Sequence, residues 1–161
     1  MDRSLTPRAP WDTRDGGSYV LALQLQQHTT VVIGRRGTIT LPAGCYLYAG
    51  SALGGLGARL RRHLQLEKRH HWHIDALRAV ATVQAIHYRV SPDRLECTIA
   101  RALLAEDGAS VPAPGFGSSD CRCPTHLIGL QSPPMSLPGW NVWRIPVQPE
   151  QSSINKLVNG S

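Results

Sequence analysis

Side chains that could act on a phosphate group gather in the segment GCYLYAGSALGGLGARLRRHL, residues 44–64. Tyr46 and Tyr48 alternate onto one side of an expected strand, and Arg59 and His63 lie about one helical turn apart. A strand, a glycine-rich turn and a helix also form the phosphate sites of nucleotide-binding proteins. The turn contains neither G-x-x-x-x-G-K-[ST] nor G-x-G-x-x-G, however. We therefore expect its glycines to allow tight backbone geometry and a close approach of a nucleic-acid strand, not to bind a nucleotide.

Basic residues are concentrated directly after this turn. The chain carries 17 Lys and Arg against 11 Asp and Glu, which gives a formal net charge of +6. Residues 59–73 contain five of these cations and four histidines, against the single acid Glu67. A solvated helix face and a surface that binds phosphates both explain such a patch. The candidate nucleic-acid-binding residues in it are Arg61, Arg62, Lys68 and Arg69.

A second group of candidate residues lies in the string GFGSSDCRCPTHL. Cys121, Cys123 and His126 form the pattern C-x-C-x-x-H, which could bind Zn²⁺ with His71 or His73 as the fourth ligand. This spacing is looser than paired C-x-x-C motifs. Two alternatives therefore stay open: the cysteines pack as small apolar residues, or Cys121 is a thiol nucleophile next to a histidine and an aspartate.

The string HWHID contains a third group. His71 and Asp75 are four residues apart, so they could pair on one helix face near a cleft, whereas His73 could be a structural histidine. Residue types alone assign no role to HWHID, or to Ser119 and Asp120 in GFGSSDCRC.

Five candidate residues match a known order of motifs. Gly17-Ser18-Tyr19, Tyr48-Ala49-Gly50, the Arg59/His63 pair and Glu96 follow the pattern G-x-Y, Y-x-G, R-x-x-x-H and E. This order resembles the GIY-YIG endonuclease superfamily, and more particularly a branch of it with HWHID and GFGSSDCxC motifs. The resemblance covers about residues 17–130. Ser18 and Ala49 replace the isoleucines of the two motifs, at positions that point away from the tyrosine face.

The resemblance implies an α+β fold, in which a small central antiparallel β-sheet is flanked by helices. It also implies metal-dependent cleavage of phosphodiester bonds in nucleic acid, with DNA as the expected partner. Tyr19 and Tyr48 would line the cleft, and one of them would help to deprotonate the attacking water. Arg59 would stabilise charge on the phosphate, His63 would assist proton transfer or orientation, and Glu96 would hold Mg²⁺ or Mn²⁺.

Elementary chemistry supports these residue types. A fixed guanidinium and a divalent cation stabilise the charge that develops on the phosphate oxygens. One carboxylate with phosphate and waters is a normal Mg²⁺ site. Because the reference pKa of tyrosine is about 10, a nearby cation or a histidine must help it to act as a base. Two other classes remain open, a non-catalytic nucleic-acid-binding module and a zinc-stapled interaction domain.

Hydrophobic periodicity predicts the elements that must position these residues. SYVLALQL and HTTVVIG predict a hairpin, and CYLYAG predicts a further strand. Leu56, Leu60 and Leu64 predict a helix from about Leu56 to Glu67. HIDALRAVA predicts a second helix and TVQAIHYRV another strand. A third helix is expected to begin after Ser91, with Pro92 at its first position, and HLIGL is expected to be a closing strand.

Length and composition indicate one domain, since 161 residues with 42% apolar content can bury a single core. We expect a flexible leader at residues 1–16, a nuclease-like domain at 17–131 and a Pro/Ser-rich tail at 132–161, partly packed through Trp140 and Trp143. No stretch resembles a signal peptide or approaches the ~20 apolar residues of a membrane span, which predicts a cytoplasmic protein with free thiols.

Overall fold

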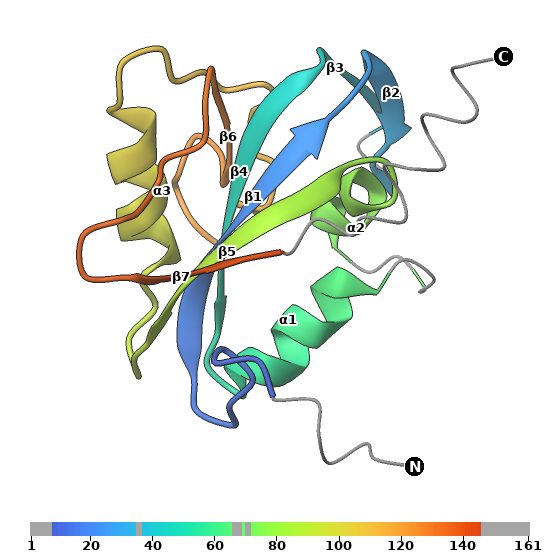
Figure 1. Ribbon diagram of the computed structural model, residues 1–161. Coiled ribbons are helices and arrows are strands. Elements are labelled where there is room, and N and C mark those ends of the chain that lie inside the picture. Colours follow the sequence, from blue (N-terminus) through green and yellow to red (C-terminus); the bar gives the residue numbers. More distant parts are fainter. Residues whose placement is uncertain (1–7, 35–36, 66–68, 70–71, 146–161) are drawn as a thin grey trace, which may run out of the picture.

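A five-stranded antiparallel sheet forms the centre of the protein, with the strand order β6-β4-β1-β5-β7 (Figure 1). The computed structural model describes residues 8–34, 37–65, 69 and 72–145. The strands are β1 (Gly17–Leu25), β4 (Gly44–Ala52), β5 (Thr82–Val90), β6 (Leu127–Leu130) and β7 (Asn141–Arg144). The predicted α+β class with a small antiparallel sheet is therefore confirmed.

The predicted pairing of β1 with the next strand is wrong. β1 pairs with β4 on one side and β5 on the other, while β2 (Thr29–Val32) and β3 (Thr38–Leu41) form a separate hairpin. The glycine turn between β2 and β3 closes this hairpin, because Ile33 N donates to Gly37 O and Gly37 has a φ of 87°. β1 can occupy the centre because almost all of its residues are buried, on both faces of the sheet.

The helices cover opposite faces of the sheet (Figure 1). α1 (Leu56–Leu64) and α2 (His73–Arg78) lie on one face, and α3 (Glu96–Leu104) lies on the other. Alternation along β1 supplies both cores: Tyr19 and Leu21 pack on the α1 side, whereas Val20 packs on the α3 side. Each fully buried leucine of this kind stabilises the fold by about 1.5–3 kcal/mol.

The first helix begins at Leu56 as predicted and ends at Leu64, while residues 66–68 lie outside the described part. Leu56 and Leu60 are fully buried, and they form the stripe that packs this helix on the sheet.

The third helix begins later than predicted. Glu96 is its first residue and Leu95 its N-cap, so the prediction of a start directly after Ser91 is wrong. Ser91 Oγ instead accepts a hydrogen bond from Asp93 N within a turn, and Leu95 N donates to Ser18 Oγ on β1. The side-chain oxygen of Ser91 therefore bonds within the turn and does not cap a helix. The helix begins only after Leu95, whose backbone is bonded to β1. Glu96 therefore lies in the first turn of α3.

The segments on either side of the predicted domain pack against it. Trp11 is buried at 4% exposure and contacts Trp143 edge to face, with ring centroids 5.7 Å apart. Trp143 belongs to β7, which extends the central sheet, and Trp140 packs against the core on the α3 side. Both tryptophans thus pack as expected, although the boundaries at residues 17 and 131 stay predictions.

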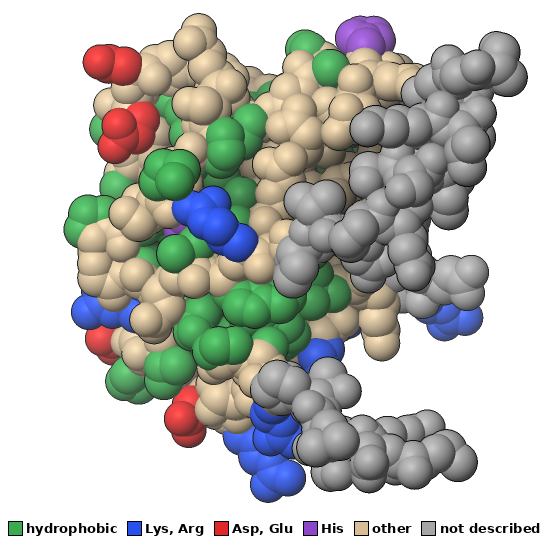
Figure 2. Space-filling model, in the orientation of Figure 1, with side chains coloured by type: hydrophobic (Ala, Val, Ile, Leu, Met, Phe, Trp, Pro, Cys, Tyr) green, Lys and Arg blue, Asp and Glu red, His purple; other side chains and the backbone are tan. Residues whose placement is uncertain are grey.

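Among the described residues, no helix combines the length and the apolarity needed to cross a bilayer. Figure 2 shows hydrophobic side chains around the middle of one face of the molecule, with Lys and Arg side chains at several separate places on that face. A single basic patch is not visible from this side.

Candidate active site and adjoining Cys/His group

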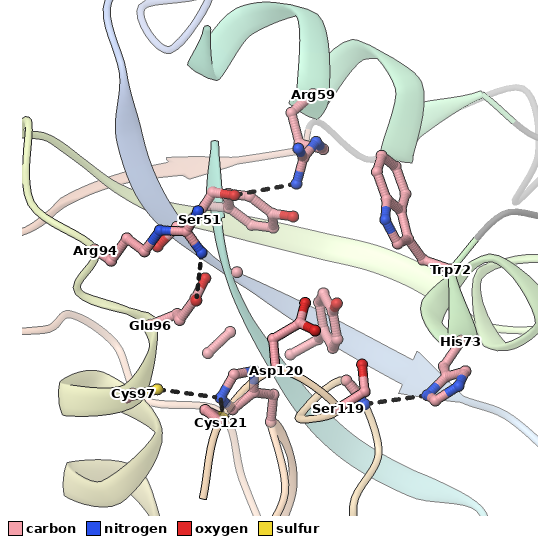
Figure 3. Close-up of a pocket in the computed structure, with 16 residues that line it drawn as sticks. Ser51, Arg59, Trp72, His73, Arg94, Glu96, Cys97, Ser119, Asp120 and Cys121 are labelled. Carbon is pink, nitrogen blue, oxygen red and sulfur yellow. Dashed lines mark hydrogen bonds and ion pairs between the residues drawn. The ribbon is translucent and has the colours of Figure 1, made fainter. Parts of the chain in front are cut away.

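A cavity of about 530 Å³ lies between α1, the start of α2, the first turn of α3 and a long loop that precedes β6 (Figure 3). Tyr19, Tyr48, Arg59 and Glu96 all line it, so residues far apart in the sequence converge on one space. His63 is 1% exposed and does not line the cavity, but it contacts Tyr19, which does. The five residues that match the motif order therefore lie in or directly beside one cavity.

Gly50 makes this convergence possible. Tyr19 on β1 is opposite Gly50 on β4, and a Cβ atom at Gly50 would collide with the ring and hydroxyl of Tyr19. A residue without a side chain is needed for the Tyr19 ring to lie across the neighbouring strand. This contact gives a physical reason for a glycine two residues after Tyr48.

Tyr19 and His63 form a buried pair. The Tyr19 hydroxyl and His63 Nε2 are hydrogen bonded at 2.6 Å. Burial raises the pKa of Tyr19 to about 12, although the charge of Arg59 and a hydrogen bond with it oppose the shift. Tyr19 is therefore a neutral phenol at neutral pH, and His63 is the neighbour positioned to exchange a proton with it.

Tyr48 lies beside this pair. Its ring packs edge to face against His63 and Phe116, with centroids 6.2 and 6.1 Å apart. Burial also raises the pKa of Tyr48 well above its ordinary value, helped by the proximity of Tyr19 and opposed by Arg59. Both tyrosines are thus phenols and not phenolates near neutral pH.

Arg59 is held by a backbone carbonyl and an aromatic ring, and not by a carboxylate, among the described residues. Its Nη1 donates to Ser51 O at 3.1 Å, and its guanidinium carbon lies 4.4 Å from the centroid of the Trp72 ring. In the described part of the chain Arg59 forms no ion pair. A cation that is fixed in this way, beside a cavity, is suited to bind an anionic group.

Two of the basic residues predicted to bind nucleic acid form ion pairs with aspartates. Arg62 binds the buried carboxylate of Asp75 through two bonds of 2.8 and 3.0 Å, and Arg61 pairs with Asp12. Arg69 is exposed, and Lys68 lies outside the described residues. The residues Arg61, Arg62 and Arg69 do not line the cavity. Their assignment to nucleic-acid binding stays a prediction.

The HWHID string positions the wall of the cavity. Asp75 accepts a hydrogen bond from Trp72 N at 2.9 Å as well as binding Arg62. His73 lines the cavity, and its Nδ1 accepts a hydrogen bond from Gly117 N at 3.2 Å. His73 therefore joins α2 to the loop before β6, while the proposed pairing of Asp75 with His71 lies outside the described residues.

Acidic groups lie on the opposite side of the cavity from Trp72. The Glu96 carboxylate, whose side chain is 18% exposed, is 3.9 Å from Arg94. Ser119 and Asp120 also line the cavity, and Figure 3 shows the Asp120 carboxylate extending into it from the loop. Carboxylate oxygens are the ligands that Mg²⁺ and Mn²⁺ prefer, so the residue types here fit a hard cation.

Three cysteines and a histidine form a group next to Glu96, and Cys97, Cys121 and His126 also line the cavity. The ligand atoms of Cys97, Cys121, Cys123 and His126 all lie within 4.8 Å of one another, an arrangement that could hold a metal ion. His126 Nε2 is 3.7 Å from Cys97 Sγ and 3.4 Å from Cys121 Sγ. His71 or His73 was the predicted fourth ligand. Among the described residues Cys97 is the fourth member and His73 binds Gly117 instead, while His71 lies outside the described residues.

The protonation of this group follows from its surroundings. Burial, then hydrogen bonds with Cys123 and Cys121, raise the pKa of Cys97 to about 12. Burial lowers the pKa of His126, against the charge of Glu96 and a hydrogen bond with the Gly117 backbone. His126 is therefore held as the neutral imidazole that binds metals.

Sequence reasoning missed three residues of this region: Trp72, Arg94 and Cys97. Trp72 is the central aromatic residue of HWHID, and its ring lies under both Arg59 and Arg62. Arg94 and Cys97 lie close to Glu96 in the string DRLECT, and this nearness in sequence was the only feature that could have pointed to them.

One family model matches the chain, over residues 18–138, and it is described as a domain of unknown function, DUF123. No curated protein matches the chain significantly, and neither does any solved structure.

Proposed function

The chain belongs to the DUF123 family, whose model covers most of its length, and we propose that it is a metal-dependent endonuclease of the GIY-YIG type. Its substrate is nucleic acid, with DNA as the first candidate. The observation that carries this proposal is the convergence of Arg59 and Glu96, with Tyr19 and Tyr48, on one cavity. A guanidinium and a carboxylate-bound cation on either side of a phosphate would stabilise the charge that develops during phosphodiester hydrolysis.

Arg59 is the proposed phosphate-binding residue. Its contacts with Ser51 O and the Trp72 ring fix the guanidinium before substrate arrives, so little entropy is lost when a phosphate binds. Arg94 lies on the far side of the cavity beside Glu96 and is 68% exposed. We assign Arg94 to the approach of the nucleic-acid backbone, where its long side chain can follow the substrate.

Glu96 is the proposed ligand of Mg²⁺ or Mn²⁺, and Asp120 is a second carboxylate of the same cavity. When bound, the cation supplies a Lewis acid for the phosphate and lowers the pKa of a bound water. Glu96 is well suited to this role because it is half-buried, and its only described ion pair is the long contact of 3.9 Å with Arg94.

The Tyr19 hydroxyl and His63 are the proposed route for a proton. Because the pKa of Tyr19 is about 12, this phenol is a poor base by itself. Its hydrogen bond with His63 Nε2 allows Tyr19 to take a proton from water while it passes its own proton to the imidazole. Tyr48 lies beside the pair and can orient the water through its hydroxyl.

Cleavage of labelled branched and single-stranded DNA with Mg²⁺ or Mn²⁺ tests the proposal. We expect Arg59→Ala and Glu96→Gln each to lower the cleavage rate by a factor of about 100 or more, as removal of one transition-state contact does in other enzymes. Matched controls are Arg101→Ala, on the last turn of α3, and Glu106→Gln, just after the helix ends, both of which change exposed residues. Cleavage at the wild-type rate by both cavity variants would refute the assignment.

A non-catalytic nucleic-acid-binding module is the competing function, and the same assay separates the two. Such a module would give no product with any divalent metal. Its binding would still weaken with salt, by about one unit of slope for each phosphate contacted.

A further inference from the structure

Four side chains of types that can bind a metal meet at the wall of the cavity, although they come from separate parts of the chain. Cys97 lies in the first turn of α3, Cys121 and Cys123 lie in the loop, and His126 directly precedes β6. Cys123 and His126 are buried, and Cys97 and Cys121 are half-buried. The group is therefore only partly buried, and Cys97, Cys121 and His126 line the cavity.

The separations of the ligand atoms match a tetrahedral zinc site. Zn–S bonds of about 2.3 Å and Zn–N bonds of about 2.0 Å place neighbouring ligand atoms roughly 3.5–3.8 Å apart. His126 Nε2 is 3.4 Å from Cys121 Sγ and 3.7 Å from Cys97 Sγ, and no pair in the group exceeds 4.8 Å. The group therefore needs at most a small contraction to close around an ion.

The ligand types select the metal. Three thiolates and one imidazole favour zinc and disfavour Mg²⁺ or Mn²⁺, which prefer oxygen ligands. Four protein ligands also leave no open position for water, which is the mark of a structural site. None of the cysteines is in a disulfide, so all three thiols are available.

We propose that Cys97, Cys121, Cys123 and His126 bind one structural Zn²⁺ that ties the loop before β6 to the first turn of α3. This loop has no helix or strand between Pro112 and Thr125, yet it carries Ser119 and Asp120 into the cavity. The zinc holds it from one side while the hydrogen bond from Gly117 N to His73 Nδ1 holds it from the other. The proposal does not depend on nuclease activity.

Metal analysis of the purified full chain, prepared without added zinc, tests this directly. We expect close to one zinc per chain, and loss of most of it in Cys97→Ser and in Cys121→Ser. Cys45→Ser is the matched control, because Cys45 is a buried thiol on β4 outside the group, and it should retain zinc. His126→Cys should also retain zinc, since it keeps four zinc ligands, which guards against variants that simply fail to fold.

Cobalt substitution gives a second readout that needs no variant. The cobalt form should show a thiolate charge-transfer band and the visible bands of tetrahedral cobalt. Removal of the bound metal with a chelator should then increase amide hydrogen exchange in residues 113–126 more than in β1.

Zinc well below one-tenth per chain in folded wild-type protein would overturn the proposal. A mass two units lower than that of the reduced chain, with the disulfide mapped to two cysteines of the group, would do the same. Neither result bears on DNA cleavage, so failure here and failure of the nuclease assignment can be told apart.

Discussion

At the scale of single residues, the site depends on a close fit between neighbouring strands. The Tyr19 ring occupies the space where a side chain at Gly50 would lie, and its hydroxyl reaches His63 Nε2 at 2.6 Å. A glycine in a strand is usually a cost, because it loses more backbone entropy than other residues. Here the missing side chain of Gly50 makes room for the Tyr19 ring.

Gly50→Ala should therefore lower the free energy of unfolding by about 1–3 kcal/mol, the usual cost of overpacking. Gly54→Ala is the matched control, because its Cβ would meet nothing within 4 Å. Urea denaturation of the two variants provides the comparison. Equal stability of the two would show that the Tyr19 ring does not need the space at Gly50.

At the scale of elements, β5 carries a buried histidine that should make the fold sensitive to acid. His87 is 1% exposed, and neither ring nitrogen has a hydrogen-bond partner among the described residues. Burial, and the nearby charge of Arg144, lower the pKa of His87 below its ordinary value. The neutral imidazole is therefore favoured in the folded state.

The sign of the pH effect follows from this shift. The stability that depends on a neutral His87 is fully present above the pKa of about 6.5 that a histidine has in the unfolded chain. It is lost as the pH falls through the lower pKa of His87 in the folded protein. His87→Leu should show a shallower loss of stability below pH ~6.5 than the wild type, by at most about 1.4 kcal/mol per pH unit for one proton. Thermal unfolding across this pH range measures the difference. The exposed variant His28→Gln should follow the wild type, and the idea fails if His87→Leu does so too.

Periodicity predicted most elements but not how they pair. The alternation in β1 and the leucine stripe of α1 are local features, so the sequence reveals them. The continuous apolar run at residues 19–23 fits a strand that is buried on both faces, but no local pattern says which strands pair with β1.

The start of α3 was misplaced because Ser91 and Pro92 fit a turn as well as a helix cap. Within the site, the order of the motif residues indicated the cavity. Cys97 was not found because its partners are more than 20 residues away and reach it only in the folded chain.

At the scale of the whole molecule, the segments before and after the predicted domain close against each other. Trp11 precedes β1 and Trp143 lies on the edge strand β7, and their rings are in contact. Gly57 N also donates to Thr13 O, which fixes the early segment against the start of α1. The chain on both sides of the predicted domain therefore contributes to one folded unit.

Trp11→Ala should lower the free energy of unfolding by about 3 kcal/mol, since loss of a buried tryptophan also leaves a cavity. Val32→Ala is the control, because Val32 is 65% exposed and should change stability by less than about 0.5 kcal/mol. Similar unfolding curves for the two variants would mean that the segment before β1 is not part of the cooperative unit.

Glu96 and Cys97 are consecutive residues of α3, and successive side chains on a helix point about 100° apart. Both residues line the cavity, and Cys97 also belongs to the cysteine group, so a rotation of α3 about its axis would move both side chains together. A twist of this helix that draws the thiol inward must swing the carboxylate by the same angle. The orientation of α3 that brings Cys97 to the loop cysteines therefore also sets the direction of the Glu96 carboxylate.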